Sequence, residues 1–372
     1  MSHKIILIAS TQYPSYGGSA TNAYAMIKSL KKRGHKVIGI FFENLNANVD
    51  PDNIGCIFRI NYFQLSTPPN TQFDFNAFQK RNYQLINKCQ TMINSIYGRE
   101  PDIMLCKNYK TPIYCRILYP QALNIYLVSG IGHLSTCFPQ LTAQQFLSTD
   151  LEIPDLYEES TTMEMTDLAV ANSTLSLNIL YKIFPKYIKK IYPSVVDTTK
   201  EIETMLAPGA SPSAKTYDFL IVSSILTRPD KNNLFLINVL KNPIFDKYTK
   251  LVVGKYSDKF KLIPNTTTYD MMPHFHLMKL MAKCKVLLYP SLVDSNPNTV
   301  REAIYHHCLV LISNNVGFYE KFPDFSICLT FGMEEWVRKS LYLVENYEKL
   351  VRSYHIDFTM DQDISSFIDN FI

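Results

Sequence analysis

The chain has 372 residues, of which 47% are hydrophobic and 19% are charged, and its formal net charge is +4. This length is at the upper edge for one core and suits two domains of about 100 to 200 residues each. The small positive charge argues against a nucleic-acid partner.

The cysteines and the apolar runs predict a protein of the cytoplasm. None of the eight cysteines belongs to a C-x-x-C pair, and several lie in apolar segments, as reduced core residues do. Apolar runs stay below the ~18 residues of a membrane helix. The first segment, MSHKIILIAST, is too short and too strand-like for a signal peptide, so secretion is not expected.

The first part of the chain alternates strand patterns with helix patterns. Residues 21–33 have the spacing of a helix. Apolar runs predict strands at residues 4–9, 37–42, 103–106, 125–128 and 168–171. Strands that alternate with helices in this way build a parallel sheet.

The loop between the first strand and the first helix, YPSYGGSAT, is a candidate ligand loop. Its Gly17 and Gly18 let the backbone approach a phosphate or a sugar closely. A turn that binds nothing is the alternative, because the loop lacks the G-x-G-x-x-G spacing of dinucleotide sites.

His133, in the segment LVSGIGHL, follows another apolar strand of the first part. A lone histidine is usually structural or solvated. Its place at a strand end, between glycines, favours a role near a ligand, because ligands of parallel sheets lie beyond the carboxyl ends of the strands.

A stretch rich in proline, glycine, serine and alanine, residues 207–216, is predicted to link two domains. The first domain spans residues 1–206 and the second 217–350, and residues 351–372 end in a helix. Strands of the second domain are predicted at residues 219–222, 251–253, 286–289 and 310–312. The predicted fold is α/β, with two Rossmann-like domains facing each other across a cleft.

The most informative segment joins a buried strand at residues 285–291, a turn at 295–298 and a helix at 299–306. Asp294 and Glu302 bracket its turn with seven residues between them. The start of a helix can bind a phosphate. Glu302 can accept hydrogen bonds from a diol such as ribose, and Asp294 can accept them from a second polyol. The ligand implied is a sugar nucleotide, and the residues beside it are Ser295, Asn296, Pro297 and Asn298 of the turn and Thr299, the first residue of the helix.

This segment resembles the retaining glycosyltransferases of family 4, which have the GT-B fold. Residues that match their E-x7-E region are Asp294, Asn296, Pro297, Asn298, Glu302, Ala303, Ser313, Gly317 and Glu320. The resemblance extends to KIILIASTQYPSYGGSATNAYAMIKSLKKRGHKVIGIFF, PDIMLC, DLAVANS and PSVVD. The chain departs from the family by having Asp294 in place of the first glutamate, and serines at 223 and 224 in place of an arginine.

The resemblance implies an enzyme that moves a hexose-type sugar from a nucleoside-diphosphate donor to a hydroxyl of a glycan or a lipid-linked acceptor, with retention. Lys231, in VSSILTRPDKNN, resembles the family's phosphate-binding lysine, and Arg228 can substitute for the missing arginine. The implied donor contacts need neither a metal nor a further cofactor.

The resemblance also assigns roles to single residues. Asp294 binds the donor sugar and Glu302 the ribose, while Gly18 and His133 form the opposite wall. Catalysis is thereby assigned to Asp294, His133 and Lys231.

Further details follow from the same resemblance. The loop at residues 266–269 holds the nucleotide base, with Tyr269 as a candidate contact. His307 stands where the family usually has glycine, so it is predicted to end its helix in a left-handed conformation. The C-terminal helix is expected to pack on the first domain.

Residues 178–192 mix four lysines with large apolar side chains and are a candidate for weak peripheral contact with an anionic membrane. Pro185 interrupts the segment, and an ordinary surface helix is the reading that we favour.

Two other functions are compatible with the sequence. One is a different GT-B activity, such as a sugar-nucleotide epimerase. The other is a non-catalytic sugar-nucleotide or carbohydrate-binding protein, which the shorter Asp294 and the missing arginine favour. Hydrolysis or transfer of a donor separates these functions, because a binding protein shows neither.

Overall fold

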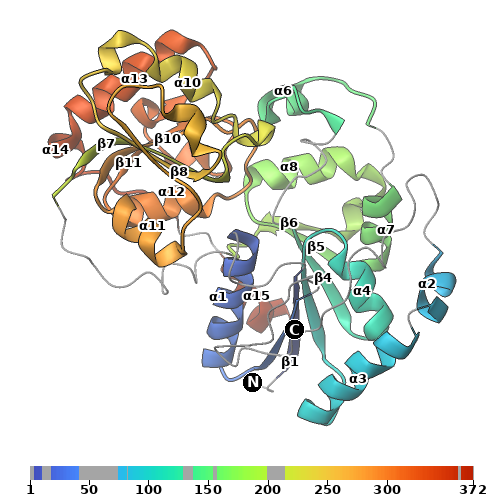
Figure 1. Ribbon diagram of the computed structural model, residues 1–372. Coiled ribbons are helices and arrows are strands. Elements are labelled where there is room, and N and C mark those ends of the chain that lie inside the picture. The colour runs from blue at the N-terminus through green and yellow to red at the C-terminus, as the bar shows by residue number, and fades with distance from the viewer. Residues whose placement is uncertain are drawn as a thin grey trace. The chain divides into compact units, whose positions relative to one another are not determined.

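The structure is a computed structural model that describes residues 4–10, 18–41, 74–81, 83–128, 137–153, 157–198, 214–358 and 362–371 (Figure 1). The chain divides into two compact units. The first contains Met1–Gly130, Glu152–Ile202 and Met360–Ile372, and the second contains Ile131–Leu151 and Glu203–Thr359. Each unit is built on a parallel six-stranded sheet.

The sheet of the first unit has the strand order β2-β1-β3-β4-β5-β6. Its strands are β1 (Ile5–Ser10), β2 (Lys36–Phe41), β3 (Ile103–Lys107), β4 (Leu123–Val128), β5 (Leu168–Ala171) and β6 (Ile191–Val195). The helices are α1 (Gly18–Lys32), α2 (Phe75–Arg81), α3 (Tyr83–Tyr97), α4 (Thr111–Leu118), α7 (Tyr157–Met165), α8 (Thr174–Ile183), the 3-10 helix η2 (Pro185–Lys190) and α15 (Ile364–Phe371). All five predicted strands are present, and β6 is an additional one.

The first sheet is buried on both faces, which explains its continuous apolar strands. In β1, Leu7 and Ala9 pack with α3 and α4 on one face. Ile6 and Ile8 pack with α1 and α15 on the other (Figure 1). The alternation follows from the two-residue period of a strand.

The C-terminal helix α15 belongs to the first unit. Its Phe367 is buried and packs edge to face against Tyr192, with ring centroids 5.1 Å apart. Asp369 forms an ion pair with Arg33 and lies 3.1 Å from Nε2 of His35. These two contacts therefore attach α15 to the turn that follows α1.

The sheet of the second unit has the order β12-β11-β10-β7-β8-β9. Its strands are β7 (Tyr217–Ile225), β8 (Lys250–Lys255), β9 (Thr266–Tyr269), β10 (Cys284–Tyr289), β11 (Leu309–Ser313) and β12 (Ile327–Cys328). The α-helices are α6 (Ala143–Ser148), α10 (Phe235–Leu240), α11 (His274–Met281), α12 (Asn298–Tyr305), α13 (Met333–Glu345) and α14 (Tyr347–Leu350). Short 3-10 helices are η3 (Pro229–Lys231), η4 (Pro243–Phe245), η5 (Ser257–Phe260), η6 (Tyr319–Lys321) and η7 (Asp324–Ser326).

The four predicted strands of the second domain correspond to β7, β8, β10 and β11. The prediction of a loop at residues 266–269 is wrong, because these residues form β9 and pair in parallel with β8. The segment TTTY has no apolar run, and at the edge of the sheet its three threonines are partly buried while Tyr269 is exposed. A polar edge strand of four residues gives a weak sequence signal.

Across the described ranges, no helix is both long enough and apolar enough to cross a bilayer. The predicted linker, residues 207–216, lies outside these ranges except for its last three residues.

Candidate functional site

Residues 294–302, which we call the motif, run from Asp294 to Glu302 and lie at the carboxyl edge of the second sheet. β10 ends at Tyr289, and α12 begins at Asn298 after Pro297, which provides no side-chain cap for the helix. Residues 290–297 therefore connect a buried strand to a helix start, as the sequence predicts. The first N–H groups of α12 and its dipole make this end attractive to an anion.

The backbone of Asp294 is fixed by the loop that follows β11. The Asp294 N–H donates to the carbonyl of Asn315 over 3.1 Å, and the Asp294 carbonyl accepts from the N–H of Gly317 over 2.7 Å. Because both contacts come from one loop, the position of Asp294 depends on the pairing of β10 with β11.

The carboxylate of Asp294 forms a cluster with two other side chains. Lys231, at the end of η3, makes an ion pair with Oδ2 of Asp294. Oη of Tyr289 donates to the same oxygen over 2.6 Å and lies 3.2 Å from Nζ of Lys231. Burial, and then the charge of Asp294, raise the pKa of Tyr289 well above its usual value, so the hydroxyl keeps its proton.

Arg228 precedes η3 and pairs with Asp230 rather than with Asp294. Its Nε lies 3.0 Å from Oδ1 of Asp230. The carbonyl of Asp230 accepts from the N–H of Leu292 over 2.8 Å and from Oγ of Ser291 over 2.9 Å. These bonds tie the loop after β7 to the loop after β10, and so bring the two cations next to the motif.

Glu302 is buried within α12 and contacts His274, which no sequence motif places at the site. Its side chain is 6% exposed, and Oε1 lies 2.8 Å from Nε2 of His274, the first residue of α11. The hydrogen bond to Glu302 raises the pKa of His274 above its usual value, although burial opposes this effect. His274 therefore contacts the carboxylate that the resemblance assigns to a ribose.

The turn before α12 is held by a buried arginine. Nε of Arg301 donates to Oδ1 of Asn296 over 3.2 Å. The guanidinium carbon lies 5.3 Å from the ring centre of Phe318 and 4.7 Å from that of Phe358. Phe318 has a left-handed φ of 58°, which a bulky residue adopts only where surrounding contacts hold it.

Helix α6 supplies a further support for the motif from a distant part of the sequence. The Ala143 N–H donates to the carbonyl of Leu292 over 2.9 Å. The Gln144 N–H donates to Oδ1 of Asn315 over 3.0 Å, and Nε2 of Gln144 to the carbonyl of Asn314 over 2.9 Å. α6 thus binds both loops that position Asp294. No sequence signal reveals this contact, because residues 135–165 match no motif.

Most of the predicted donor-binding residues come together in the second unit. At the carboxyl ends of β7 and β10 and the start of α12 lie Arg228, Lys231, Asp294, Ser295, Asn296, Pro297, Asn298, Thr299 and Glu302. Gly18 is the first residue of α1 in the first unit. Gly17 and His133 lie outside the described residues, so their roles stay predictions. His307 has the predicted left-handed conformation, with a φ of 57°.

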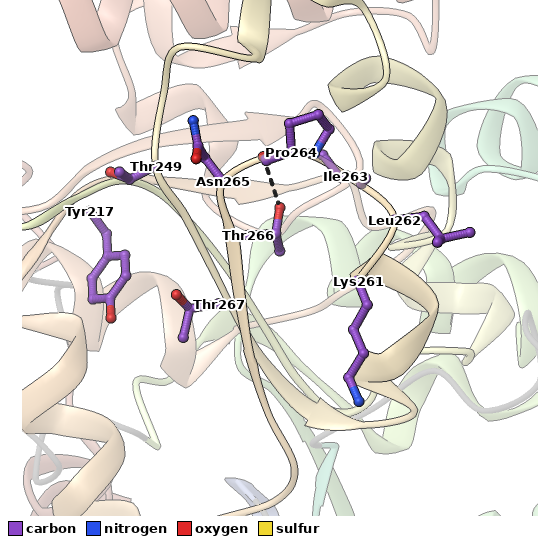
Figure 2. Close-up of a pocket in the computed structure, with 9 residues that line it drawn as sticks. All are labelled: Tyr217, Thr249, Lys261, Leu262, Ile263, Pro264, Asn265, Thr266 and Thr267. Atoms are coloured by element: carbon purple, nitrogen blue, oxygen red, sulfur yellow. Dashed lines mark hydrogen bonds between the residues drawn. The ribbon is translucent and has the colours of Figure 1, made fainter.

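A shallow pocket lies at the opposite edge of the second sheet (Figure 2). Its volume is about 460 Å³, and it is lined by Tyr217, Thr249, Lys261, Leu262, Ile263, Pro264, Asn265, Thr266 and Thr267. Tyr217 and Thr266 begin β7 and β9, so the pocket faces the amino ends of these strands. Ligands of parallel sheets bind beyond the carboxyl ends, and we therefore place the site at the motif.

The His274–Glu302 contact predicts a pH dependence of stability. Because the pKa of folded His274 is raised, its contribution is present below the unfolded value, about 6.5, and is lost as the pH rises through the folded value. The difference in unfolding free energy between the wild type and His274→Gln should therefore be largest below pH ~6.5 and shrink as the pH rises above it. Urea unfolding across this range measures it. A difference that grows with pH would contradict the assignment.

No protein-family model matches the chain, and no curated protein sequence matches it. Solved structures do match its fold. A glycosyltransferase from Rickettsia africae has a TM-score of 0.61 and 16% identity, with 95% of this chain and 93% of that chain covered. The catalytic domain of starch synthase IV from Arabidopsis thaliana, bound to ADP and acarbose, has a TM-score of 0.61 and 12% identity, with 94% of each chain covered.

A third similar structure is HepE from Anabaena in complex with UDP and glucose. It has a TM-score of 0.59 and 13% identity, with 94% of this chain and 95% of that chain covered. Sequence identities this low show that the fold is shared, but they do not show that the reaction is shared. The chain therefore has the GT-B fold that these glycosyltransferases share, with two Rossmann-like units built on parallel six-stranded sheets.

Proposed function

We propose that this chain is a retaining glycosyltransferase that transfers a hexose-type sugar from a nucleoside-diphosphate sugar to a hydroxyl of a glycan or lipid-linked acceptor. The observation that carries the proposal is the gathering of Lys231, Asp294 and Glu302 at the start of α12, on the carboxyl edge of the second sheet. Similar structures hold UDP with glucose, and ADP with acarbose, which supports a sugar nucleotide as the ligand class.

Each side chain of this group has a role that its chemistry suits. Lys231 and Arg228 neutralise the leaving diphosphate together with the N–H groups of α12. Glu302 accepts hydrogen bonds from the ribose, and Asp294 from hydroxyls of the donor sugar. In a retaining transfer of this kind, the leaving phosphate takes the proton of the acceptor hydroxyl on the same face. The protein contributes positioning and charge stabilisation, and the reaction proceeds without a metal.

A screen of nucleotides tests the ligand class most directly. UDP, GDP, ADP and their common sugar conjugates are each added to the full chain, and the thermal unfolding midpoint is measured. A ligand present at about a hundred times its dissociation constant stabilises the folded state by roughly 2.7 kcal/mol. We expect one base to stabilise the protein more than the others do. If no nucleotide of the panel shifts the midpoint, the proposed donor class is wrong.

Glu302→Gln is expected to weaken binding of that nucleotide. Loss of a charged hydrogen bond to a hydroxyl costs roughly 1.5 to 3 kcal/mol, while the amide keeps the size of the side chain and an oxygen that His274 can contact. Titration calorimetry measures the affinity, and the matched control is Glu334→Gln, at an exposed position in the first turn of α13. Wild-type affinity in Glu302→Gln would show that Glu302 does not bind the ribose.

A non-catalytic sugar-nucleotide-binding protein is the second candidate. It is favoured by Asp294, which is one methylene shorter than glutamate and is paired with Lys231. Incubation with the donor found in the screen separates the two candidates, because a transferase releases nucleoside diphosphate by transfer or slow hydrolysis. A binding protein leaves the donor intact.

We also propose that the protein is cytoplasmic, and that η2 is the segment through which it would make weak contact with a membrane surface. Lys186, Ile188 and Lys189 are exposed on η2, and Ile188 is 51% exposed. Lys190 points elsewhere, since its Nζ donates to the carbonyls of Met163 and Glu164 over 2.9 and 2.8 Å. Sedimentation with vesicles that contain an anionic lipid tests this contact.

A further inference from the structure

The two side chains with the most important proposed roles are paired with each other. Lys231 is assigned to the diphosphate and Asp294 to the donor sugar, yet they form an ion pair in which the side chains are 17% and 13% exposed. Neither group can take up its proposed role at full strength while this pair persists. Binding of a donor therefore requires an exchange of partners.

The charges of the cluster balance without a ligand. Lys231 pairs with Asp294, and Arg228 pairs with Asp230. A diphosphate adds negative charge and attracts Lys231, because charge-assisted hydrogen bonds to phosphate are strong. When Lys231 turns to the phosphate, Asp294 loses its cation. A largely buried carboxylate that loses its cation must keep another hydrogen-bond donor.

Tyr289 is placed to be that donor. Tyr289 is 6% exposed, and its hydroxyl lies 2.6 Å from Oδ2 of Asp294. The residue ends β10, a central strand between β11 and β7, so its ring is fixed by the sheet. The hydroxyl can hold Asp294 in place whether or not Lys231 is present.

We propose that the Lys231–Asp294 ion pair competes with the donor diphosphate, and that Tyr289 is a positioning residue that holds Asp294 for the sugar once Lys231 has moved to the phosphate. The inference rests on the proposed function. It makes recognition of the sugar depend on the diphosphate, because Asp294 becomes available to the sugar only after the exchange. A free hexose should therefore not bind by itself.

If the ion pair competes with the diphosphate, Asp294→Asn should strengthen binding of the nucleoside diphosphate while it slows sugar transfer. Asp294→Asn keeps the shape of the side chain and an oxygen acceptor, but it releases Lys231. The nucleoside diphosphate selected by the screen should bind Asp294→Asn roughly tenfold more tightly than it binds the wild type, which corresponds to ~1.4 kcal/mol. Turnover of the sugar donor should fall. Equal or weaker binding of the diphosphate would overturn the inference.

A double-mutant cycle separates exchange from simple repulsion between Asp294 and the phosphates. In a Lys231→Ala background no lysine is released, so adding Asp294→Asn should change the affinity by less than about twofold. If the tenfold gain persisted without Lys231, repulsion alone would explain it and the exchange would be rejected.

Tyr289→Phe tests the positioning role, because it removes only the hydroxyl. We expect kcat to fall by about tenfold, while KM and the affinity for the nucleoside diphosphate stay within about twofold of the wild type. An unchanged kcat, or a parallel loss of diphosphate affinity, would exclude a role specific to Asp294.

These outcomes also separate the inference from the proposed function. Failure of the wild type and all variants to bind any nucleoside diphosphate would reject both. Diphosphate binding and sugar transfer by the wild type, without tighter binding by Asp294→Asn, would reject the exchange alone.

Discussion

Replacing Lys231 with alanine is expected to lower sugar transfer by about a hundredfold to a thousandfold, the loss found when one preorganised charge-stabilising donor is removed. Lys231 stabilises the charge that develops on the leaving diphosphate in our proposal. Its removal also leaves Asp294 with Tyr289 but without a cation. Steady-state transfer rates with saturating donor measure the effect.

Two controls define what this result means. Lys259→Ala removes an exposed lysine of the same unit, on η5, and should leave the rate unchanged. Lys231→Arg keeps the charge and should retain more activity than Lys231→Ala. We also expect the wild type to remain active in EDTA. Loss of transfer in EDTA, with recovery on adding magnesium or manganese, would contradict charge stabilisation by Lys231 without a metal.

Trp336→Ala is expected to cause the largest loss of stability, about 3 to 5 kcal/mol, because it leaves a large cavity in the core of the second unit. Trp336 lies on α13 and is fully buried. Its ring packs against Phe235, with ring centroids 5.7 Å apart, and stacks on Phe331 at 6.3 Å. Its Nε1 donates to the carbonyl of Thr330 over 3.0 Å. Urea unfolding of the full chain measures the change.

The matched variant Trp336→Phe keeps most of the apolar volume and removes the indole N–H, so it should lose less stability than Trp336→Ala. Because Trp336 contacts none of the motif residues in its described interactions, either variant that remains folded should bind nucleotide with wild-type affinity. A loss below about 1 kcal/mol for Trp336→Ala would mean that the core closes around the missing ring.

The sequence predicts the strands that have strong apolar runs and the segment that contains the candidate site. The runs at residues 4–9 and 286–289 become β1 and β10, because strands buried on both faces must be apolar throughout. The left-handed conformation of His307 was also predicted, because the family that the chain resembles usually has glycine at that position. β9 was not, because its polar residues lie at a sheet edge.

Which side chains meet could not be predicted from the sequence, because it depends on the tertiary structure. Lys231 and Asp294 are 63 residues apart in the sequence, and they pair because β7 and β10 are neighbours in the sheet, which places their carboxyl-end loops together. Tyr289 has the sequence pattern of a core residue, and its hydroxyl gains a role only through these two partners. Hydrophobic periodicity encodes the faces of strands and helices but not the order of strands, and it is the strand order that assembles this site.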